Sequence, residues 1–323
     1  MNNSGNGSNN QFYFEVARDV WGMRDVFVNI YMIRNSNDNT WVLIDAGLKS
    51  SGHKIRKMAR QLFGELPPAA IVLTHGHFDH VGSIGKLSNE WKVPVYAHYM
   101  ELPYLMGKSS YPPPDPTVGG GMMAWVAKVY PNSPINIESI VSVLPEDGVV
   151  PFLNEWKYLH TPGHAPGHIS LFRESDRLLI AGDAFVTTKQ ESAIAILLQT
   201  EKVSRPPAYF TYDWDAAYQS VEKLAMLNPQ TVATGHGKPM SGEEMRHELH
   251  QLYVNFYEEA VPETGRYIDD PAVVNASGVI YLPSRQQQAS KLNWWAIGSA
   301  IVLSAAVIAL LTVKKQKRRF SLR

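Results

Sequence analysis

Residues 74–82, THGHFDHVG, constrain the fold more than any other stretch of this chain. They follow directly on the apolar run AAIVL, which is typical of a short buried strand. Four side chains that bind metal ions, those of His75, His77, Asp79 and His80, then lie within six positions. The fold must therefore bring these polar groups together at the end of a buried strand, and other parts of the sequence have to complete the site.

Four further clusters repeat this arrangement of an apolar run followed by a polar residue with a glycine nearby. They contain Asp45 in LIDAG, His164 and His168 in TPGHAPGH, Asp183 in AGDAF and His236 in ATGHG. Glycine lets the backbone approach a compact site closely, and loops at strand ends are where a layered domain gathers functional residues. We expect all five clusters to lie along one rim of a sheet.

The spacing of these residues predicts two metal ions. His75 and His77 can place two imidazoles on one ion from a tight loop, whereas Asp79 and His80 point elsewhere and can serve a second ion. The downstream clusters add His164, Asp183 and His236. Seven candidate ligands are too many for one tetrahedral zinc with an open position, but they suit two ions that share a bridging carboxylate. Because the chain has no cysteine, the ligands are nitrogen and oxygen atoms, which favour Zn²⁺ and also suit iron or manganese.

The pattern of apolar residues predicts an α/β domain. Alternating stretches over residues 11–47 are typical of β-structure, and residues 51–66 have helical spacing. A second helix over 213–227 should stop at Asn228-Pro229, and Ser241 with Glu244 forms a capping box that should open a helix reaching to about Ala260. Strands interleaved with helices in this way predict a layered arrangement.

The five clusters, in this order, resemble those of the metallo-β-lactamase superfamily, and the resemblance covers roughly residues 12–260. It implies a four-layer αββα sandwich, in which two mixed sheets lie between outer helices. The implied ligands of the first metal ion are His75, His77 and His164, those of the second are Asp79, His80 and His236, and Asp183 bridges the two. Asp45 and His168 are implied to steady these ligands without binding metal.

The chemistry expected of such a site is hydrolysis. Two divalent ions lower the pKa of a shared water from about 15.7 toward neutrality, which provides a metal-bridging hydroxide, and they polarise the carbonyl or phosphoryl oxygen under attack. Asp79 is the expected catalytic residue, because it can hold the hydroxide and then help to protonate the leaving group. The expected substrate is a small molecule with an ester, thioester, lactone or phosphodiester bond.

Further details narrow the function without fixing the substrate. A carboxylate at Asp183 resembles the glyoxalase II and lactonase branches and differs from the three-histidine β-lactamases, but Val186 stands where quorum-lactone lactonases have a tyrosine. With 30 basic and 30 acidic residues the net charge is zero, so we expect no nucleic acid partner. Two alternatives stay open: an oxidoreductase with one iron, similar to persulfide dioxygenases, and a membrane-tethered metal-binding protein without activity.

The chain divides into several expected segments. Residues 1–11 are polar and expected to be disordered, 12–262 form the hydrolase domain, and 263–293 are a linker. Within the domain, 101–137 is rich in proline and glycine and is expected to be an irregular insertion. Its apolar side chains favour a lid over the substrate, with core packing or a membrane-facing patch as the alternatives: Tyr104, Met106, Tyr111, Met122, Met123 and Trp125.

The C-terminus predicts a membrane anchor. Residues 294–313 hold 20 uncharged residues, which is enough to span a hydrocarbon core of roughly 30 Å, and a basic tail follows over 314–323. The positive-inside rule places that tail in the cytoplasm and the domain outside, whereas the absence of a secretory signal at the N-terminus favours a cytoplasmic domain. The side of the membrane and the oligomeric state stay open.

Overall fold

The computed structural model describes residues 12–119, 121–198 and 200–284. The polar segment 1–11, the expected anchor 294–313 and the basic tail lie outside these residues. Among the described residues, no helix has the length and apolar character needed to cross a membrane.

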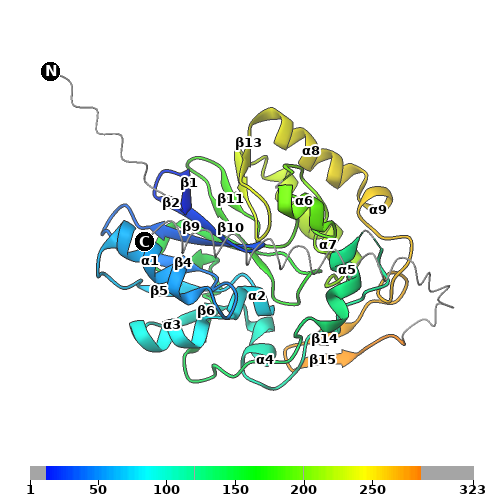
Figure 1. Cartoon of the computed structure of the whole chain (residues 1–323), viewed down its shortest axis with the longest axis horizontal. Coiled ribbons are helices and arrows are strands. Elements are labelled where there is room, and N and C mark those ends of the chain that lie inside the picture. The colour runs from blue at the N-terminus through cyan, green and yellow to red at the C-terminus, as the bar shows by residue number, and fades with distance from the viewer. Residues whose placement is uncertain (1–11, 120, 199, 285–323) are drawn as a thin grey trace, which may run out of the picture. The chain divides into compact units, whose positions relative to one another are not determined.

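Two mixed sheets form the centre of the domain (Figure 1). The first has seven strands in chain order: β1 (Tyr13–Ala17), β2 (Val20–Asp25), β3 (Val28–Arg34), β4 (Trp41–Ile44), β5 (Ala70–Val72), β6 (Val95–Ala97) and β7 (Val141–Val143). Pairing is antiparallel from β1 to β4 and parallel from β4 to β7.

The second sheet has six strands in the order β13-β12-β11-β10-β9-β8. Their bounds are β8 (Val149–Val150), β9 (Leu153–His160), β10 (Ile169–Arg173), β11 (Leu178–Ile180), β12 (Thr231–Ala233) and β13 (Met240–Ser241). The pair β11 and β12 is parallel, and the other pairs are antiparallel. A separate hairpin joins β14 (Val273–Asn275) to β15 (Gly278–Tyr281).

Strand alternation explains how the sheets stack. In β3, Ile30 and Met32 pack toward the outer helices, whereas Tyr31 and Ile33 pack toward the second sheet. Successive side chains of a strand point to opposite faces, so a strand buried on both faces reads as a continuous apolar run. The cluster between the sheets combines side chains from both, for example Ile44 of β4 with Ile180 of β11.

Helices cover the outer face of each sheet. Side chains of α1 (Gly52–Phe63) and α3 (Ile84–Trp91) join the apolar cluster of the first sheet, and those of α7 (Trp214–Met226) and α8 (Gly242–Val254) join the cluster of the second. Figure 1 shows the two helix groups on opposite sides of the sheets. The predicted order of layers, helix, sheet, sheet and helix, is confirmed.

The capping box predicted at Ser241 is not formed. Ser241 is the residue that precedes α8, but among the described residues its side chain makes no capping hydrogen bond. The helix also ends at Val254, and a short α9 (Phe256–Glu259) follows after Asn255. Ser241 instead belongs to β13, where its backbone pairs with Thr231. Sheet pairing therefore holds Ser241 in place of the predicted side-chain cap.

The insertion 101–137 has more regular structure than expected. It contains α4 (Leu102–Leu105), α5 (Met122–Val126) and the 3₁₀ turn Ala127–Val129, and follows a 3₁₀ turn at Tyr99–Glu101. Its two ends pair through the backbone, because Ile135 and Ile137 donate hydrogen bonds to the carbonyl groups of Tyr104 and Leu105 at 3.0 and 2.8 Å. The insertion is therefore a closed loop attached to the first sheet.

Residues 263–284, expected to belong to a linker, instead fold onto this insertion. The hairpin β14–β15 contacts it where the backbone N–H of Val279 donates to Oγ of Ser109 at 3.1 Å. The hydroxyl of Tyr267 donates to the carbonyl of Pro113 at 2.8 Å. The compact unit extends to Ser284, beyond the predicted domain boundary at residue 262.

Candidate metal centre

The ends of two parallel strand pairs form one rim of the sandwich. Asp45 follows β4 and His75 follows the neighbouring β5, while Asp183 follows β11 and His236 follows the neighbouring β12. Neighbouring parallel strands end at the same edge of a sheet. A backbone hydrogen bond of 2.7 Å from Asn29 to Gly235 joins the two sheets at this rim, and the loop between β9 and β10 adds His164.

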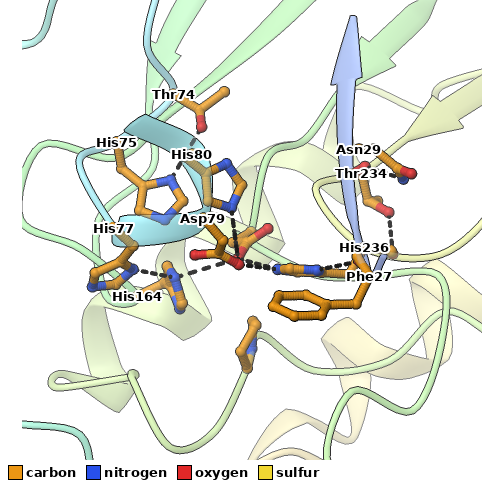
Figure 2. Close-up of polar contacts among 12 residues, drawn as sticks. Phe27, Asn29, Thr74, His75, His77, Asp79, His80, His164, Thr234 and His236 are labelled. Carbon is orange, nitrogen blue, oxygen red and sulfur yellow. Dashed lines mark hydrogen bonds and ion pairs between the residues drawn. The ribbon is translucent and has the colours of Figure 1, made fainter. Parts of the chain in front are cut away.

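All seven predicted metal ligands meet at this rim, and Figure 2 labels the six of them other than Asp183. They form three overlapping groups whose ligand atoms lie within 4.8 Å of one another: His75, His77 and His164; His75, His80 and Asp183; Asp79, His80 and His236. The first and third groups coincide with the two ligand sets that the family resemblance implies. The short helix α2 (Phe78–Val81) gives Asp79 and His80 their different direction from His75 and His77.

Asp183 lies between the two ligand sets. Its Oδ2 is 3.4 Å from Nε2 of His164 in the first set, and 3.0 and 3.6 Å from Nε2 of His236 and His80 in the second. One carboxylate oxygen thus faces imidazole nitrogens of both sets. This is the position expected of a bridging ligand.

The remaining ring nitrogen of several histidines is held by a fixed partner. Nδ1 of His80 lies 2.8 Å from Oδ2 of Asp45, Nδ1 of His236 lies 2.8 Å from the carbonyl of Phe27, and Nδ1 of His75 lies 3.1 Å from Oγ1 of Thr74. A partner at Nδ1 fixes the ring orientation and directs Nε2 into the centre.

Asp45 and His168 each contact a member of the predicted ligand sets, His80 and Asp183 respectively. Asp45 adopts a left-handed backbone conformation (φ 62°), and its carboxylate accepts hydrogen bonds from the backbone N–H and the hydroxyl of Thr74 at 2.8 and 2.7 Å. Nε2 of His168 accepts a hydrogen bond from the backbone N–H of Asp183 at 2.8 Å. Burial lowers the pKa of His168 to about 3, so the ring is neutral and holds the loop of Asp183 in place.

Unpaired buried atoms test whether the centre suits metal ions. The seven side chains have exposed fractions of 0% to 5%. Among the described residues, Nε2 of His75, Nε2 of His80 and Oδ1 of Asp183 have no hydrogen-bond partner. Burying such groups without partners is costly, whereas imidazole nitrogens and carboxylate oxygens are good ligands for divalent ions. The donor set therefore fits two metal ions.

The histidines of the two ligand sets differ in the direction of their pKa shifts. Burial, reinforced by the neighbouring His80, holds the pKa of His75 well below its usual range, and burial with His164 does the same for His77. In the other set, burial lowers the pKa of His80 and of His236, but the neighbouring carboxylates, led by Asp183, together outweigh burial and raise both pKa values. The first set thus offers neutral imidazoles, which metal binding requires, and the second is arranged around carboxylates.

Aromatic rings surround the ligands. The ring of Phe210 stacks on that of His77 with centroids 4.3 Å apart, and the ring of Phe27 stacks on that of His236 at 5.9 Å. Neither phenylalanine was predicted, since Phe27 lies in the turn between β2 and β3 and Phe210 in an irregular segment. The two rings thus place apolar surface against one histidine of each predicted ligand set.

The predicted lid residues differ in where they lie: some are near the metal centre, one is core and one is exposed. Tyr111 touches the ring of His77 with centroids 4.6 Å apart, and Met123 packs on the cluster that contains Phe210. Tyr104 is core, 1% exposed, and stacks on Tyr111. Trp125 is 45% exposed. The insertion therefore contacts the metal centre, but not through all six of the predicted side chains.

Comparisons with known proteins agree with this geometry. The family model of the metallo-β-lactamase superfamily matches residues 23–236. The probable metallo-hydrolase YflN of Bacillus subtilis (strain 168) is 47% identical over 241 residues, which cover 74% of this chain and 91% of the relative. The probable metallo-hydrolase YybB of the same organism is 30% identical over 192 residues, covering 59% and 73%.

Solved structures show the same fold. The BLEG-1 B3 metallo-β-lactamase superposes with a TM-score of 0.51 at 23% identity and covers 73% of this chain and 97% of that protein. A β-lactamase domain protein from Burkholderia ambifaria gives 0.53 at 22% identity, covering 76% and 75%. At these identities the likeness concerns the fold alone. The family match and the similarity to metallo-hydrolases show that the chain belongs to the metallo-β-lactamase superfamily and is a metal-dependent hydrolase.

Proposed function

We propose that this protein is a dinuclear hydrolase that cleaves an ester, thioester, lactone or phosphodiester bond in a small molecule, and that it belongs to the branch of its superfamily that resembles glyoxalase II and the lactonases. One observation carries the proposal: Oδ2 of Asp183 faces nitrogens of both ligand sets. A bridging carboxylate there distinguishes this branch from the three-histidine β-lactamases.

The ligand sets assign roles to the chain's own residues. The ions held by these sets would supply an activated water and polarise the bond to be cleaved. Asp79 would act on protons: its Oδ2 faces Nε2 of His236 and His80 at 3.6 and 3.9 Å, which leaves Oδ1 to accept a proton from water and pass it to the leaving group. Asp45 and Thr74 keep His80 oriented while this happens.

The space beside the ligands supports a small substrate with an apolar part. A cavity of about 820 Å³ has His77 and Tyr111 in its wall, together with Phe78, Ile84 and Ile135. Lys49 is the one charged residue among the described residues that line it. Cavities of this size hold drug-sized molecules, and apolar walls with few polar groups are typical of small-molecule sites.

We further propose that residues 294–313 anchor the enzyme to a membrane in a single pass. The support is the uncharged length of this segment and the basic tail that follows it. Protease treatment of intact and of lysed cells tests the anchor and its orientation. Cleavage of the main domain only after lysis places it in the cytoplasm, cleavage in intact cells places it outside, and recovery of the protein in the soluble fraction contradicts the anchor.

A substrate panel tests the proposed reaction. The zinc-loaded full chain is offered an aryl ester, a thioester, a lactone and a phosphodiester, with Asp183→Asn as the matched variant. We expect turnover of at least one of these bonds, lost by a factor of 10² or more in the variant because one ligand of both sets is weakened. Oxygen consumption with a persulfide, by protein that holds one iron and hydrolyses nothing in the panel, would contradict the proposal.

A further inference from the structure

Glu101 is a buried carboxylate that the proposed metal chemistry does not use. It ends the 3₁₀ turn Tyr99–Glu101 at the start of the insertion and is 0% exposed. Among the described residues it has no lysine, arginine or histidine in an ion pair, and burial raises its pKa to about 7 against the effect of its hydrogen bonds. A buried acid without a cation is costly to the fold, so its surroundings must compensate in another way.

Hydrogen-bond donors from two ligand loops converge on this carboxylate. The backbone N–H of Gly76 donates to Oε2 at 2.8 Å, and the backbone N–H of Gly167 donates to Oε1 at 2.7 Å. Gly76 lies between His75 and His77, whereas Gly167 belongs to the loop of His164. The two carboxylate oxygens thus connect the two loops that supply the whole first ligand set.

Both glycines are needed for this close approach. A Cβ atom at Gly76 would lie 2.4 Å from the hydroxyl oxygen of Tyr111 and 3.3 Å from Oε2 of Glu101. At Gly167 it would lie 2.8 Å from both Cγ and the backbone nitrogen of Glu101. Contacts below 3.0 Å force the neighbour to move, so the absence of a side chain at both positions leaves the room that Glu101 fills.

Tyr111 connects the same group to a ligand ring. Its hydroxyl donates to Oε2 of Glu101 and accepts a hydrogen bond from the backbone N–H of Gly76 at 2.9 Å. Its ring lies against that of His77 with centroids 4.6 Å apart. The insertion therefore contributes two side chains that hold the backbone and one imidazole of the first ligand set.

We propose that Glu101, supported by Tyr111, is a positioning residue of the metal centre that sets the separation of the loop 75–77 from the loop 164–168 and thereby the geometry of the first metal site. The inference rests on the proposed two-metal function and adds to it a residue outside the ligand set. Removing the carboxylate leaves the buried N–H of Gly76 with one acceptor, Tyr111, and the buried N–H of Gly167 with none. The two loops then lose the side chain that connects them.

The insertion supplies a closely matched control. Tyr104 and Tyr111 stack with centroids 4.0 Å apart and both are buried, at 1% and 4% exposed. Among the described residues, the hydroxyl of Tyr104 has no hydrogen-bond partner, whereas that of Tyr111 contacts Glu101. Tyr104→Phe and Tyr111→Phe therefore remove the same atom from the same stack, and only the second change removes a hydrogen bond to Glu101.

Cobalt titration of the full chain separates the two metal sites. His80→Ala is used as a background in which only the first site binds, and His77→Ala as one in which only the second binds. In the first background we expect Glu101→Gln to weaken Co²⁺ binding by about 10- to 100-fold, the range known for partners of metal ligands. We expect Tyr111→Phe to weaken it less and to alter the visible spectrum of bound cobalt, and Tyr104→Phe to change nothing. In the second background we expect all three variants to bind within about threefold of their parent.

The outcomes distinguish this inference from a general role in folding and from the proposed function. Equal losses in both backgrounds, or unchanged affinity of Glu101→Gln in the first, overturn the positioning role. Urea unfolding of the metal-free variants shows whether they fold. If Glu101→Gln does not fold, Glu101→Asp and Tyr111→Phe decide by the same criterion. If the wild-type chain binds two ions and Glu101→Gln leaves the Co²⁺ affinity of the first site unchanged, only this inference is contradicted. If the wild-type chain binds no second ion, the proposed function is contradicted.

Discussion

Oδ2 of Asp45 lies 2.8 Å from Nδ1 of His80, and the same carboxylate accepts two hydrogen bonds from Thr74. Asp45 directly follows β4, the first strand of the parallel pair β4–β5, and His80 lies in α2, the helix that comes after β5. This contact ties the direction of the His80 ring, a predicted metal ligand, to the end of strand β4. We therefore expect the geometry of the centre to depend also on residues outside the predicted ligand sets.

Asp45→Asn should weaken the second metal site selectively. Asparagine tolerates the left-handed backbone that Asp45 adopts, so the loop should keep its shape, but the charge that supports His80 is lost. We expect a 10- to 100-fold loss of affinity for the second ion, measured by competition with a chelating dye. Asp19→Asn is the matched control, because Asp19 also has a positive φ (63°). It pairs with Arg34, which lies beside the start of β4, the end opposite to Asp45. Equal affinity of the two variants would contradict the role of Asp45.

His80→Ala should empty the second site and abolish hydrolysis. His80 belongs to two of the three ligand groups and is 0% exposed. We expect the variant to retain one ion per chain and to lose a factor of 10³ or more in kcat/KM, an order of magnitude typical of lost electrostatic stabilisation. His53→Ala, at an exposed position, serves as the control. Full activity of His80→Ala refutes the two-metal mechanism.

Metal removal should destabilise the fold. Ions that bind the folded chain alone stabilise it by about 2.7 kcal/mol for each site at a free concentration of 100 Kd. For a domain of this size each kcal/mol corresponds to roughly 2–4 °C in Tm, so chelation should lower Tm by about 5–10 °C for each ion lost. Differential scanning calorimetry with and without chelator measures this. An unchanged Tm means that the buried side chains hold no tightly bound ion.

The stacked pair His98 and His160 should make stability depend on pH. The rings lie 4.0 Å apart, and burial together with the charge of His160 lowers the pKa of His98 to about 4. Between pH 6.5 and 4 the unfolded chain therefore binds a proton that folded His98 does not, and stability falls as the pH falls through this window.

His98→Asn should reduce that dependence. Nδ1 of His98 accepts the backbone N–H of Met100, and an asparagine oxygen can replace it as a cap. In urea unfolding of metal-free protein, we expect wild type to lose about 1–2 kcal/mol more than the variant between pH 7.5 and pH 5. The exposed His250→Asn should behave like wild type, and identical pH profiles for all three proteins would show that His98 titrates normally.

The sequence predicted the ligands because their information is local. Where a predicted ligand lies just after an apolar strand and beside a glycine, strand recognition alone places it at a rim. That pattern holds for His75, Asp183 and His236, and the structure brings all seven predicted ligands together. Their binding of two metal ions stays a prediction.

The supporting residues could not be predicted in the same way. The carbonyl of Phe27 holds His236 from a position 209 residues away, and backbone groups carry no signature in the sequence. Glu101 is a single acid in a stretch without periodicity, and its partners are two backbone N–H groups and the hydroxyl of Tyr111. The helix predicted to open at Ser241 does begin at Gly242, but the capping box does not form, and Ser241 instead pairs with Thr231 of β12. Long-range contacts decided each of these cases.

Metal stoichiometry tests the central claim most directly. The full chain is stripped with chelator, titrated with Zn²⁺ and desalted, and bound metal is then counted by mass spectrometry against protein concentration. We expect two zinc ions per chain, with hydrolytic activity that rises as the second site fills. A titration that saturates at one ion per chain, with activity already complete, would contradict the two-metal centre.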